Sequence, residues 1–291
     1  MNGQLDIFGN VEKDDTEQIV NVASVPQRSP FRYPGGKTWL IPAFRRWMRQ
    51  FDPGQITFIE PFAGGGIVSL TTAFEKLAHR VIMVELDEEI AAVWETMLNG
   101  DNDWLTQQIL EFEMNLENVQ KRLANEKKTV RETAFATILK NRVFHGGIIT
   151  KGSGLIKHGE NGKGLTSRWY PRTLASRISS IRSVSHKIQF IRGDAFQIIQ
   201  QYFNEPMAVF FVDPPYTVAG KRLYTYFDID HEALFSAMSK VAGNVLMTYD
   251  DTPEVRAWSD KFQLHYKLIP MKTTHHLEKY ELLISNKPIN L

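Results

Sequence analysis

Residues 208–216 read Ala-Val-Phe-Phe-Val-Asp-Pro-Pro-Tyr, an apolar run that stops abruptly at an acid, two prolines and an aromatic ring. The first five residues, apolar and partly β-branched, predict a buried strand of a parallel sheet. The strand must end at the prolines, because neither has an N–H group to donate to a neighbouring strand. We therefore expect Asp213 and Tyr216 at the carboxyl edge of an open α/β sheet, where such sheets bind ligands.

The four residues Asp213-Pro214-Pro215-Tyr216 suit a planar ring that carries an amino group. The prolines can hold the Asp213 carboxylate and the Pro214 carbonyl as neighbouring acceptors for the two hydrogens of an amine. Tyr216 offers a face on which a planar ring can stack. An exocyclic amine of a nucleobase meets both requirements. The same residues could also be an ordinary strand end followed by a turn, which is common for Asp-Pro.

The composition indicates a globular protein with one large or two modest domains. Hydrophobic residues make up 43% of the 291 residues, which is ample for a core. With no cysteine, the chain has no disulfide, thiolate metal ligand or cysteine nucleophile. The polar, acidic start does not resemble a signal peptide, and no apolar run approaches the ~20 residues of a membrane-spanning helix. We expect a soluble, cytoplasmic protein with no membrane partner.

The net charge of +1 hides a strongly basic middle. Between Lys121 and Arg192 the chain carries 16 Lys or Arg against three glutamates, whereas the rest has 18 basic and 30 acidic residues. A solvated helix surface usually mixes both signs. A segment of one sign therefore favours a surface that binds nucleic acid.

A glycine-rich turn follows an earlier predicted strand in the order expected of a nucleoside site. Ile56–Glu60 reads as a strand, Pro61–Gly66 as a turn with three consecutive glycines, and Ile67–Leu77 as a helix. The next predicted strand, Val81–Val84, is followed by Glu85, which can accept hydrogen bonds from ribose hydroxyls. Because the dinucleotide fingerprint is not met, we expect a single nucleoside without pyrophosphate rather than NAD.

A second glycine turn lies near the N-terminus, where residues 31–37 read Phe-Arg-Tyr-Pro-Gly-Gly-Lys. Its backbone N–H groups can approach a ligand closely, and Lys37 opens a helix predicted over 38–50. The Walker spacing is absent. This turn suits a carboxylate better than a triphosphate, although it could be an ordinary loop before a helix.

Three motifs in order, separated by a basic insertion, resemble those of the Dam-type DNA adenine-N6 methyltransferases. They are Tyr33-Pro-Gly-Gly-Lys37, Glu60-Pro-Phe-Ala-Gly-Gly-Gly66 and Asp213-Pro-Pro-Tyr216. The resemblance implies an α/β fold, a Rossmann-like S-adenosyl-L-methionine-dependent methyltransferase sheet with a mainly helical, basic insertion that recognises the target. The implied domains are a flexible tail over 1–28, a catalytic domain over 29–100 and 186–291, and an inserted DNA target-recognition domain over 101–185.

The resemblance also implies the activity, which is methyl transfer from S-adenosyl-L-methionine to N6 of a flipped adenine in double-stranded DNA, without a metal. Asp213, Pro214 and Tyr216 would be the catalytic residues. Many relatives have aspartate where this chain has Glu85, and relatives use an acid near the cofactor adenine where this chain has Asp194. The implied cofactor-binding residues are Tyr33, Gly35, Lys37, Phe62, Ala63, Gly64, Glu85, Asp194, Phe196 and Asp213.

The basic middle supplies the expected DNA contacts. Apolar spacing predicts a helix over 103–124, and the capping-box signature of Thr129 and Glu132 opens another that ends near Arg142. A glycine-rich loop over 144–165 follows, which we expect to become ordered on DNA. The expected DNA-binding residues are Asn141, Arg142, Lys151, Lys157, Lys163, Arg168, Arg172, Lys221 and Arg222.

The C-terminal part completes the expected sheet. Asp230 is a predicted cap for a helix that ends near Val241. Strands are predicted over 244–248, 262–268 and 280–285, and the last two can form an antiparallel edge.

The first residues carry a separate signal. Gln4-Leu5-Asp6-Ile7-Phe8 resembles the short peptide by which many bacterial DNA-handling proteins dock on the replicative sliding clamp. A match of this length often arises by chance, so the sliding clamp is a hypothetical partner.

Other functions remain open from the sequence. RNA adenine could be the substrate. Cytosine-N4 transfer usually has serine in place of Asp213, and a protein glutamine amide is disfavoured by the basic insertion. The chain could also be a catalytically silent DNA-binding relative, which the intact acid and aromatic ring argue against.

Overall fold

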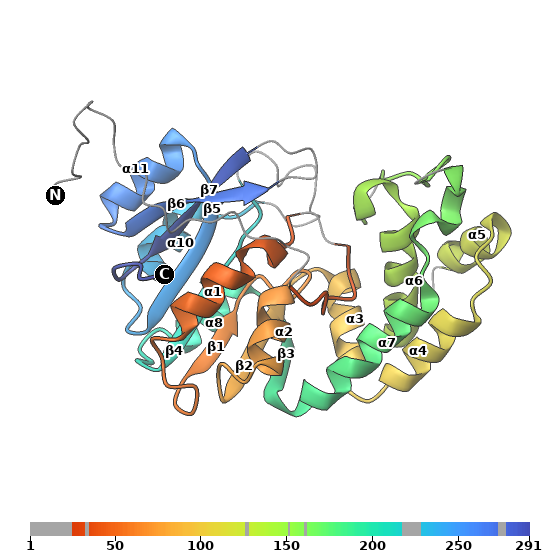
Figure 1. Cartoon of the computed structure of the whole chain (residues 1–291), viewed down its shortest axis with the longest axis horizontal. Helices are drawn as coiled ribbons and strands as arrows, with labels where there is room; N and C mark the ends of the chain where they lie inside the picture. Colours follow the sequence, from red (N-terminus) through yellow and green to blue (C-terminus); the bar gives the residue numbers. More distant parts are fainter. Residues whose placement is uncertain are drawn as a thin grey trace.

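A computed structural model of the chain describes residues 25–32, 35–125, 128–150, 152–159, 162–216, 228–272 and 278–291. Within these ranges the strands form a seven-stranded sheet in the order β3-β2-β1-β4-β5-β7-β6 (Figure 1). β7 runs antiparallel to β5 and β6, and the other neighbours are parallel. The α/β class and the antiparallel edge are therefore confirmed. The strands are β1 (Thr57–Glu60), β2 (Arg80–Glu85), β3 (Ile188–Arg192), β4 (Ala208–Val212), β5 (Asn244–Asp250), β6 (His265–Lys272) and β7 (Glu278–Ser285).

Helices cover both faces of the sheet, which explains why β4 is apolar and buried along its whole length. Side chains alternate between the two faces of a strand. Val209 and Phe211 pack into one buried cluster with residues of α1, α2 and α3, and Phe210 and Val212 into another with residues of α8, α10 and α11. These helices are α1 (Ile41–Met48), α2 (Ile67–Phe74), α3 (Glu88–Leu98), α8 (Ala195–Gln201), α10 (His231–Met238) and α11 (Pro253–Lys261).

The segment between α3 and β3 is mainly helical and stands beside the sheet rather than on it (Figure 1, yellow to green). Thr129 and Glu132 form the expected capping box at the start of α6, as Asp230 caps α10. The helices of this insertion are α4 (Asn102–Glu111), α5 (Leu116–Ala124), α6 (Val130–Val143) and α7 (Pro171–Ile181).

The helical segment expected over 103–124 is divided into two helices, because the chain breaks between α4 and α5. Asn115 caps α5 by accepting a hydrogen bond from the N–H group of Asn118. In the break, Phe112 packs edge-on against Phe135 and Trp169, at ring-centroid distances of 5.3 and 5.9 Å. The break thus lets Phe112 pack against the same buried cluster that includes residues of α1, α2 and α3.

The glycine-rich segment 144–165 is more regular than expected. It contains the 3-10 helix η3 (His145–Gly147), begins a second one, η5 (Gly164–Arg168), and pairs Phe144 with Leu155 in a β-bridge. Gly147 has a φ of 75°, and a Cβ atom there would lie 2.6 Å from the carbonyl oxygen of Arg32. This part of the segment therefore packs tightly against the chain that precedes Lys37.

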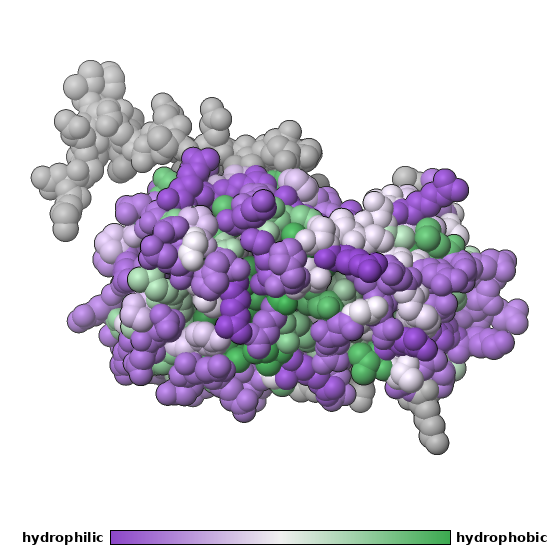
Figure 2. Space-filling view, turned by 90° about the horizontal axis from the view of Figure 1, so that it is seen from below, coloured by the Kyte–Doolittle hydropathy of each residue, from purple (hydrophilic) through white to green (hydrophobic). Residues whose placement is uncertain are grey.

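Polar residues dominate the face of the molecule seen in Figure 2, with smaller hydrophobic areas between them. Among the described helices, none is long and apolar enough to cross a membrane.

Candidate active site

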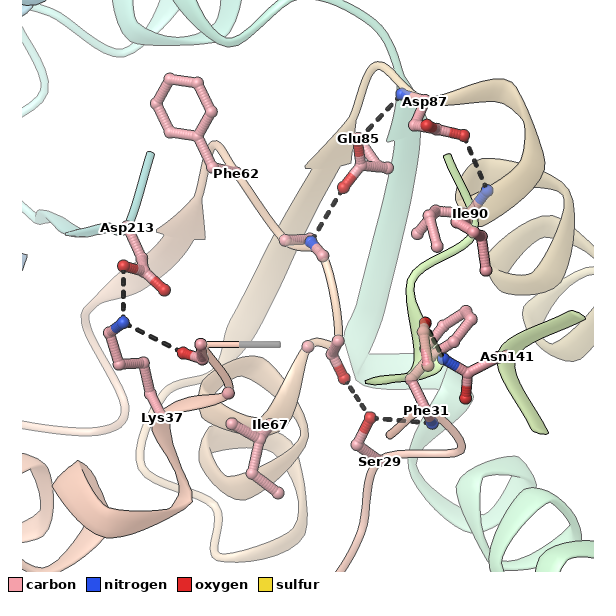
Figure 3. Close-up of a pocket in the computed structure, with 18 of the residues that line it drawn as sticks. Ser29, Phe31, Lys37, Phe62, Ile67, Glu85, Asp87, Ile90, Asn141 and Asp213 are labelled. Carbon is pink, nitrogen blue, oxygen red and sulfur yellow. Dashed lines mark hydrogen bonds and ion pairs between the residues drawn. The ribbon is translucent and has the colours of Figure 1, made fainter. Parts of the chain in front are cut away.

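The three motifs meet at the carboxyl edge of the sheet, around a cavity of about 930 Å³ (Figure 3). β1 leads into the glycine turn, β2 into Glu85, β3 into Asp194 and β4 into Asp213. Gly35 and Lys37 close the cavity from the N-terminal side. A cavity of this size holds a drug-sized ligand. Of the expected cofactor and catalytic residues, those that line it are Gly35, Lys37, Phe62, Ala63, Gly64, Glu85, Asp194, Phe196 and Asp213.

Asp213 is held through one carboxylate oxygen. Oδ1 accepts a hydrogen bond from the Thr248 hydroxyl at 2.7 Å and lies 3.0 Å from Nζ of Lys37. Among the described residues no donor is found for Oδ2, the other carboxylate oxygen. Within the described part of the chain, one acceptor of this carboxylate is therefore held in place and the other has no donor.

Lys37 is a buried cation between two carboxylates. Its Nζ atom lies 3.6 Å from Oε2 of Glu281 and donates a hydrogen bond to the Gly35 carbonyl at 3.0 Å. Burial alone would lower the pKa of Lys37, but the charges of Asp213 and Glu281 outweigh it, so the pKa is raised. The ammonium therefore stays protonated.

Tyr216 is fixed at both ends but does not line the cavity. Its hydroxyl donates to Oε2 of Glu281 at 2.8 Å. Its ring stacks on Tyr249 at a centroid distance of 5.7 Å and an angle of 19°, and Nζ of Lys37 lies 4.9 Å from its centroid. Burial and the nearby acids raise the pKa of Tyr216, so the phenol stays neutral.

The glycine turn and Glu85 together line one part of the cavity. The N–H groups of Gly64 and Asp87 donate to the two carboxylate oxygens of Glu85, each at 2.9 Å. Burial raises the pKa of Glu85 to about 7, although these N–H groups oppose the shift. An ionised carboxylate only accepts hydrogen bonds, so Glu85 is suited to accept from the hydroxyls of a ribose. The longer acid at this position does not prevent that fit.

Asp194 has a structural task besides its place in the cavity wall. Its Oδ1 atom accepts from the N–H groups of Phe196 and Gln197 at 2.8 and 3.2 Å and so caps α8. This cap sets the direction in which Phe196 leaves the sheet edge. Phe196 and Phe62 both line the cavity and offer apolar surface to an aromatic ring.

Asn141 and Arg142 are not the surface residues that a simple DNA contact requires. They are 1% and 6% exposed and line the cavity from α6. Asn141 accepts from the Arg32 N–H group and donates to the carbonyls of Arg32 and Gly147, at 2.9 to 3.0 Å. Arg142 donates to the Pro30 carbonyl. Their bonds instead hold the N-terminal segment against the insertion.

Arginines gather on this wall of the cavity. Burial and the repulsion of neighbouring arginines lower the pKa of Arg142 to about 9. Nη1 of Arg177 donates to the Ser29 carbonyl at 2.9 Å. Within the described part of the chain, neither side chain forms an ion pair with a carboxylate. The arginines around Arg142 are Arg177, Arg32 and Arg168.

The remaining expected DNA-binding residues fall into three groups. Arg168 lines the cavity and donates to the Phe144 carbonyl at 3.3 Å. Lys157, Lys163 and Arg172 are exposed and lie outside the cavity wall. Lys151, Lys221 and Arg222 lie outside the described residues, as do Tyr33, expected at the cofactor, and the peptide 4–8, expected at the sliding clamp.

Reasoning from the sequence missed several residues of the site. Glu60, on β1, is buried, and burial raises its pKa to about 8 while Ser69 opposes the shift. Glu281 stands out as an acid within the apolar run of residues 280–284, Tyr-Glu-Leu-Leu-Ile, which was a usable signal. Thr248 and Tyr249 give no such signal. Nowhere in the described ranges do three or more His, Cys, Asp or Glu side chains gather as metal ligands.

Comparisons with known proteins give a family and distant structural neighbours. A model of the D12 class N6 adenine-specific DNA methyltransferase family matches residues 33–271. No curated protein matches the sequence. A proposed RNA methyltransferase from Pyrococcus horikoshii is 12% identical, covering 88% of this chain and 84% of its own, with a TM-score of 0.40. The rRNA methyltransferase aviRa from Streptomyces viridochromogenes is 12% identical, covering 94% and 92%, with a TM-score of 0.38.

Proposed function

Because the chain belongs to the D12 class N6 adenine-specific DNA methyltransferase family, we propose that it transfers a methyl group to N6 of a flipped adenine in duplex DNA. Membership of this family confirms the Dam-type resemblance and makes the protein a methyltransferase that depends on S-adenosyl-L-methionine. The geometry of Asp213 supports an amine as the group that accepts the methyl. One carboxylate oxygen is held by the protein, and the other is left to accept a hydrogen bond from the amine.

The chain's own residues would orient the amine. We propose that N6 donates one hydrogen to Oδ2 of Asp213 and the other to the Pro214 carbonyl, while the base packs toward Tyr216, just beyond Pro215 in the cavity wall. These bonds weaken the conjugation of the nitrogen lone pair with the ring. Fixing the amine in this way provides positioning and fixed dipoles, which supply much of the acceleration in such transfers.

S-adenosyl-L-methionine supplies a methyl group activated on a sulfonium. The amine nitrogen would form a bond to the methyl carbon, and the former carbon–sulfur bonding pair would stay on the sulfur. The nitrogen would then release one proton to the Asp213 carboxylate, which would pass it to water. We propose that Glu85 binds the ribose, that Asp194 and Phe196 lie near the adenine, and that Gly35, Lys37 and the 62–64 turn bound the methionine end.

The DNA would lie between the two parts of the molecule. We propose that residues 101–185 form the target-recognition unit and that residues 29–100 and 186–291 form the catalytic unit. Arg168 and Arg177 approach the cavity from the insertion, and exposed Lys157, Lys163 and Arg172 would contact phosphates farther out. Asn141 and Arg142 lie behind this surface and hold the N-terminal segment through hydrogen bonds to Arg32 and Pro30.

Labelled S-adenosyl-L-methionine, offered with duplex DNA, single-stranded DNA and RNA, tests the substrate. N6-methyladenine from duplex DNA, identified by mass spectrometry of the nucleosides, would support the proposal. Label in RNA or in N4-methylcytosine would replace the proposed substrate. Asp213→Ala should abolish transfer while DNA binding persists, and full activity of that variant would refute the role of Asp213.

Two further proposals concern partners and location. Residues 4–8 could dock on a bacterial sliding clamp, which would place the protein on newly replicated DNA in the cytoplasm. A peptide of residues 1–12 that does not bind purified clamp would remove this proposal.

A further inference from the structure

Glu281 is an acid in the interior of the sheet. It lies on β7, opposite Asp250 of β5, and is 5% exposed. The residues that follow it, Leu282, Leu283 and Ile284, are all fully buried. An ionised side chain in such surroundings is costly unless it is paired and hydrogen-bonded.

The partners of Glu281 are residues of the candidate active site. Its Oε2 atom accepts the Tyr216 hydroxyl at 2.8 Å and lies 3.6 Å from Nζ of Lys37. Lys37 lies 3.0 Å from Oδ1 of Asp213 on its other side. One ammonium therefore stands between two carboxylates, and Glu281 is linked to Asp213 through their shared partner Lys37.

We propose that Glu281 is a positioning residue for methyl transfer, which anchors Lys37 and Tyr216 so that Asp213 presents Oδ2 to the incoming amine. This inference rests on the proposed function. Lys37 and Thr248 both bond to Oδ1, so the orientation of the carboxylate depends on where Lys37 is held. The hydrogen bond to Glu281 also holds the Tyr216 hydroxyl, so the Tyr216 ring stays in place for the base that is proposed to pack toward it.

The charge of Glu281 also matters for the reacting nitrogen. With Asp213 and Glu281 ionised and Lys37 protonated, the three side chains carry a net negative charge. The nitrogen becomes positive as it binds the methyl carbon and before it releases its proton. Negative charge held nearby in a low-dielectric site stabilises that change.

Glu281→Gln tests the proposal because it keeps the shape and the acceptor for Tyr216 but removes the charge. The single-turnover rate should fall about 10- to 100-fold, the range expected for a hydrogen-bonded charge. The dissociation constants for S-adenosyl-L-methionine and for DNA, measured separately at equilibrium, should stay within about twofold, because Glu281 does not line the cavity. Tyr280→Phe, on the neighbouring exposed residue of β7, is the matched control and should behave as wild type.

The pH dependence separates positioning from a purely structural role. The titratable groups around Glu281 are Lys37, Asp213, Tyr216 and Asp250. Burial raises the pKa of Glu281, although Lys37 opposes the shift. As the pH falls, protonation of Glu281 in the wild-type protein removes the same charge as the substitution. The wild-type rate should therefore approach the Glu281→Gln rate at low pH.

A second variant keeps the test decisive if Glu281→Gln does not fold. Tyr216→Phe keeps the ring and removes only the hydroxyl that donates to Glu281, and should lower the single-turnover rate about fivefold.

Rates of Glu281→Gln within twofold of wild type, or an equal loss at every pH together with weaker cofactor binding, would overturn the proposal. Failure of the wild-type protein to methylate duplex DNA would instead overturn the proposed function. If it methylates RNA, the same variants are compared on RNA.

Discussion

Nζ of Lys37 lies 3.0 Å from Oδ1 of Asp213, so the first and the last of the three sequence motifs meet in one buried ion pair. The resemblance assigns Lys37 to the cofactor, but its nearest charged partner belongs to the site proposed for the base. Lys37 therefore lies where the cofactor and the base would meet. Replacing Lys37 should also change the charge balance around Asp213 and Glu281.

Lys37→Met should destabilise the protein mainly at high pH. It leaves the buried Glu281 and the partly buried Asp213 without their cation, which should lower the free energy of unfolding by about 3 kcal/mol near pH 8. The loss should shrink near pH 5, where protonation of a carboxyl group relieves the repulsion. Urea unfolding at the two pH values measures this. Lys261→Met breaks an exposed pair with Glu232 and should cost less than about 1 kcal/mol at either pH; a similar cost for Lys37→Met would contradict the prediction.

Thr248→Val should slow catalysis. Thr248 is fully buried and donates its hydroxyl to Asp213 at 2.7 Å. Valine keeps the shape but leaves Oδ1 with one donor fewer, so the single-turnover rate should fall about tenfold. Thr248→Ser retains the hydroxyl and should recover most of the rate. If serine and valine were equally slow, packing rather than the hydrogen bond would be responsible.

Glu60→Gln should change how stability depends on pH. Burial raises the pKa of Glu60 from 4.5 to about 8 on folding. Its contribution to stability is therefore fully present below pH 4.5 and is lost as the pH rises through about 8. The unfolding free energy of Glu60→Gln, relative to wild type, should rise by roughly 2 to 5 kcal/mol across this window. Denaturant unfolding over the pH series measures it, with exposed Glu111→Gln as the control; parallel curves for Glu60→Gln and wild type would disprove the shift.

The sequence predicts the site residues that lie within a short motif. It misses the residues that come together only when strands from distant parts of the chain pair. A strand followed by Asp213 and prolines, or by Glu85, can be recognised within a few residues. Thr248 reaches Asp213 because β5 pairs with β4, and Glu281 reaches this site because β7 pairs with β5. No short stretch of sequence encodes these registers. Asn141 was expected at the DNA because its neighbours are basic, but the N-terminal segment covers that face of α6. The break at Phe112 similarly follows from packing against Trp169.

Arg177→Ala should weaken DNA binding in a salt-dependent way. Arg177 lines the cavity from α7, and its Nη1 atom bonds the Ser29 carbonyl, which leaves other N–H groups of the guanidinium for a phosphate. Loss of one phosphate contact should reduce the slope of log K against log salt by about 1. Arg182→Ala, which removes an exposed pair with Asp103 outside the cavity wall, is the matched control. Titrations at several salt concentrations give the slopes, and equal slopes for the wild-type protein and Arg177→Ala would show that Arg177 only holds the N-terminal segment.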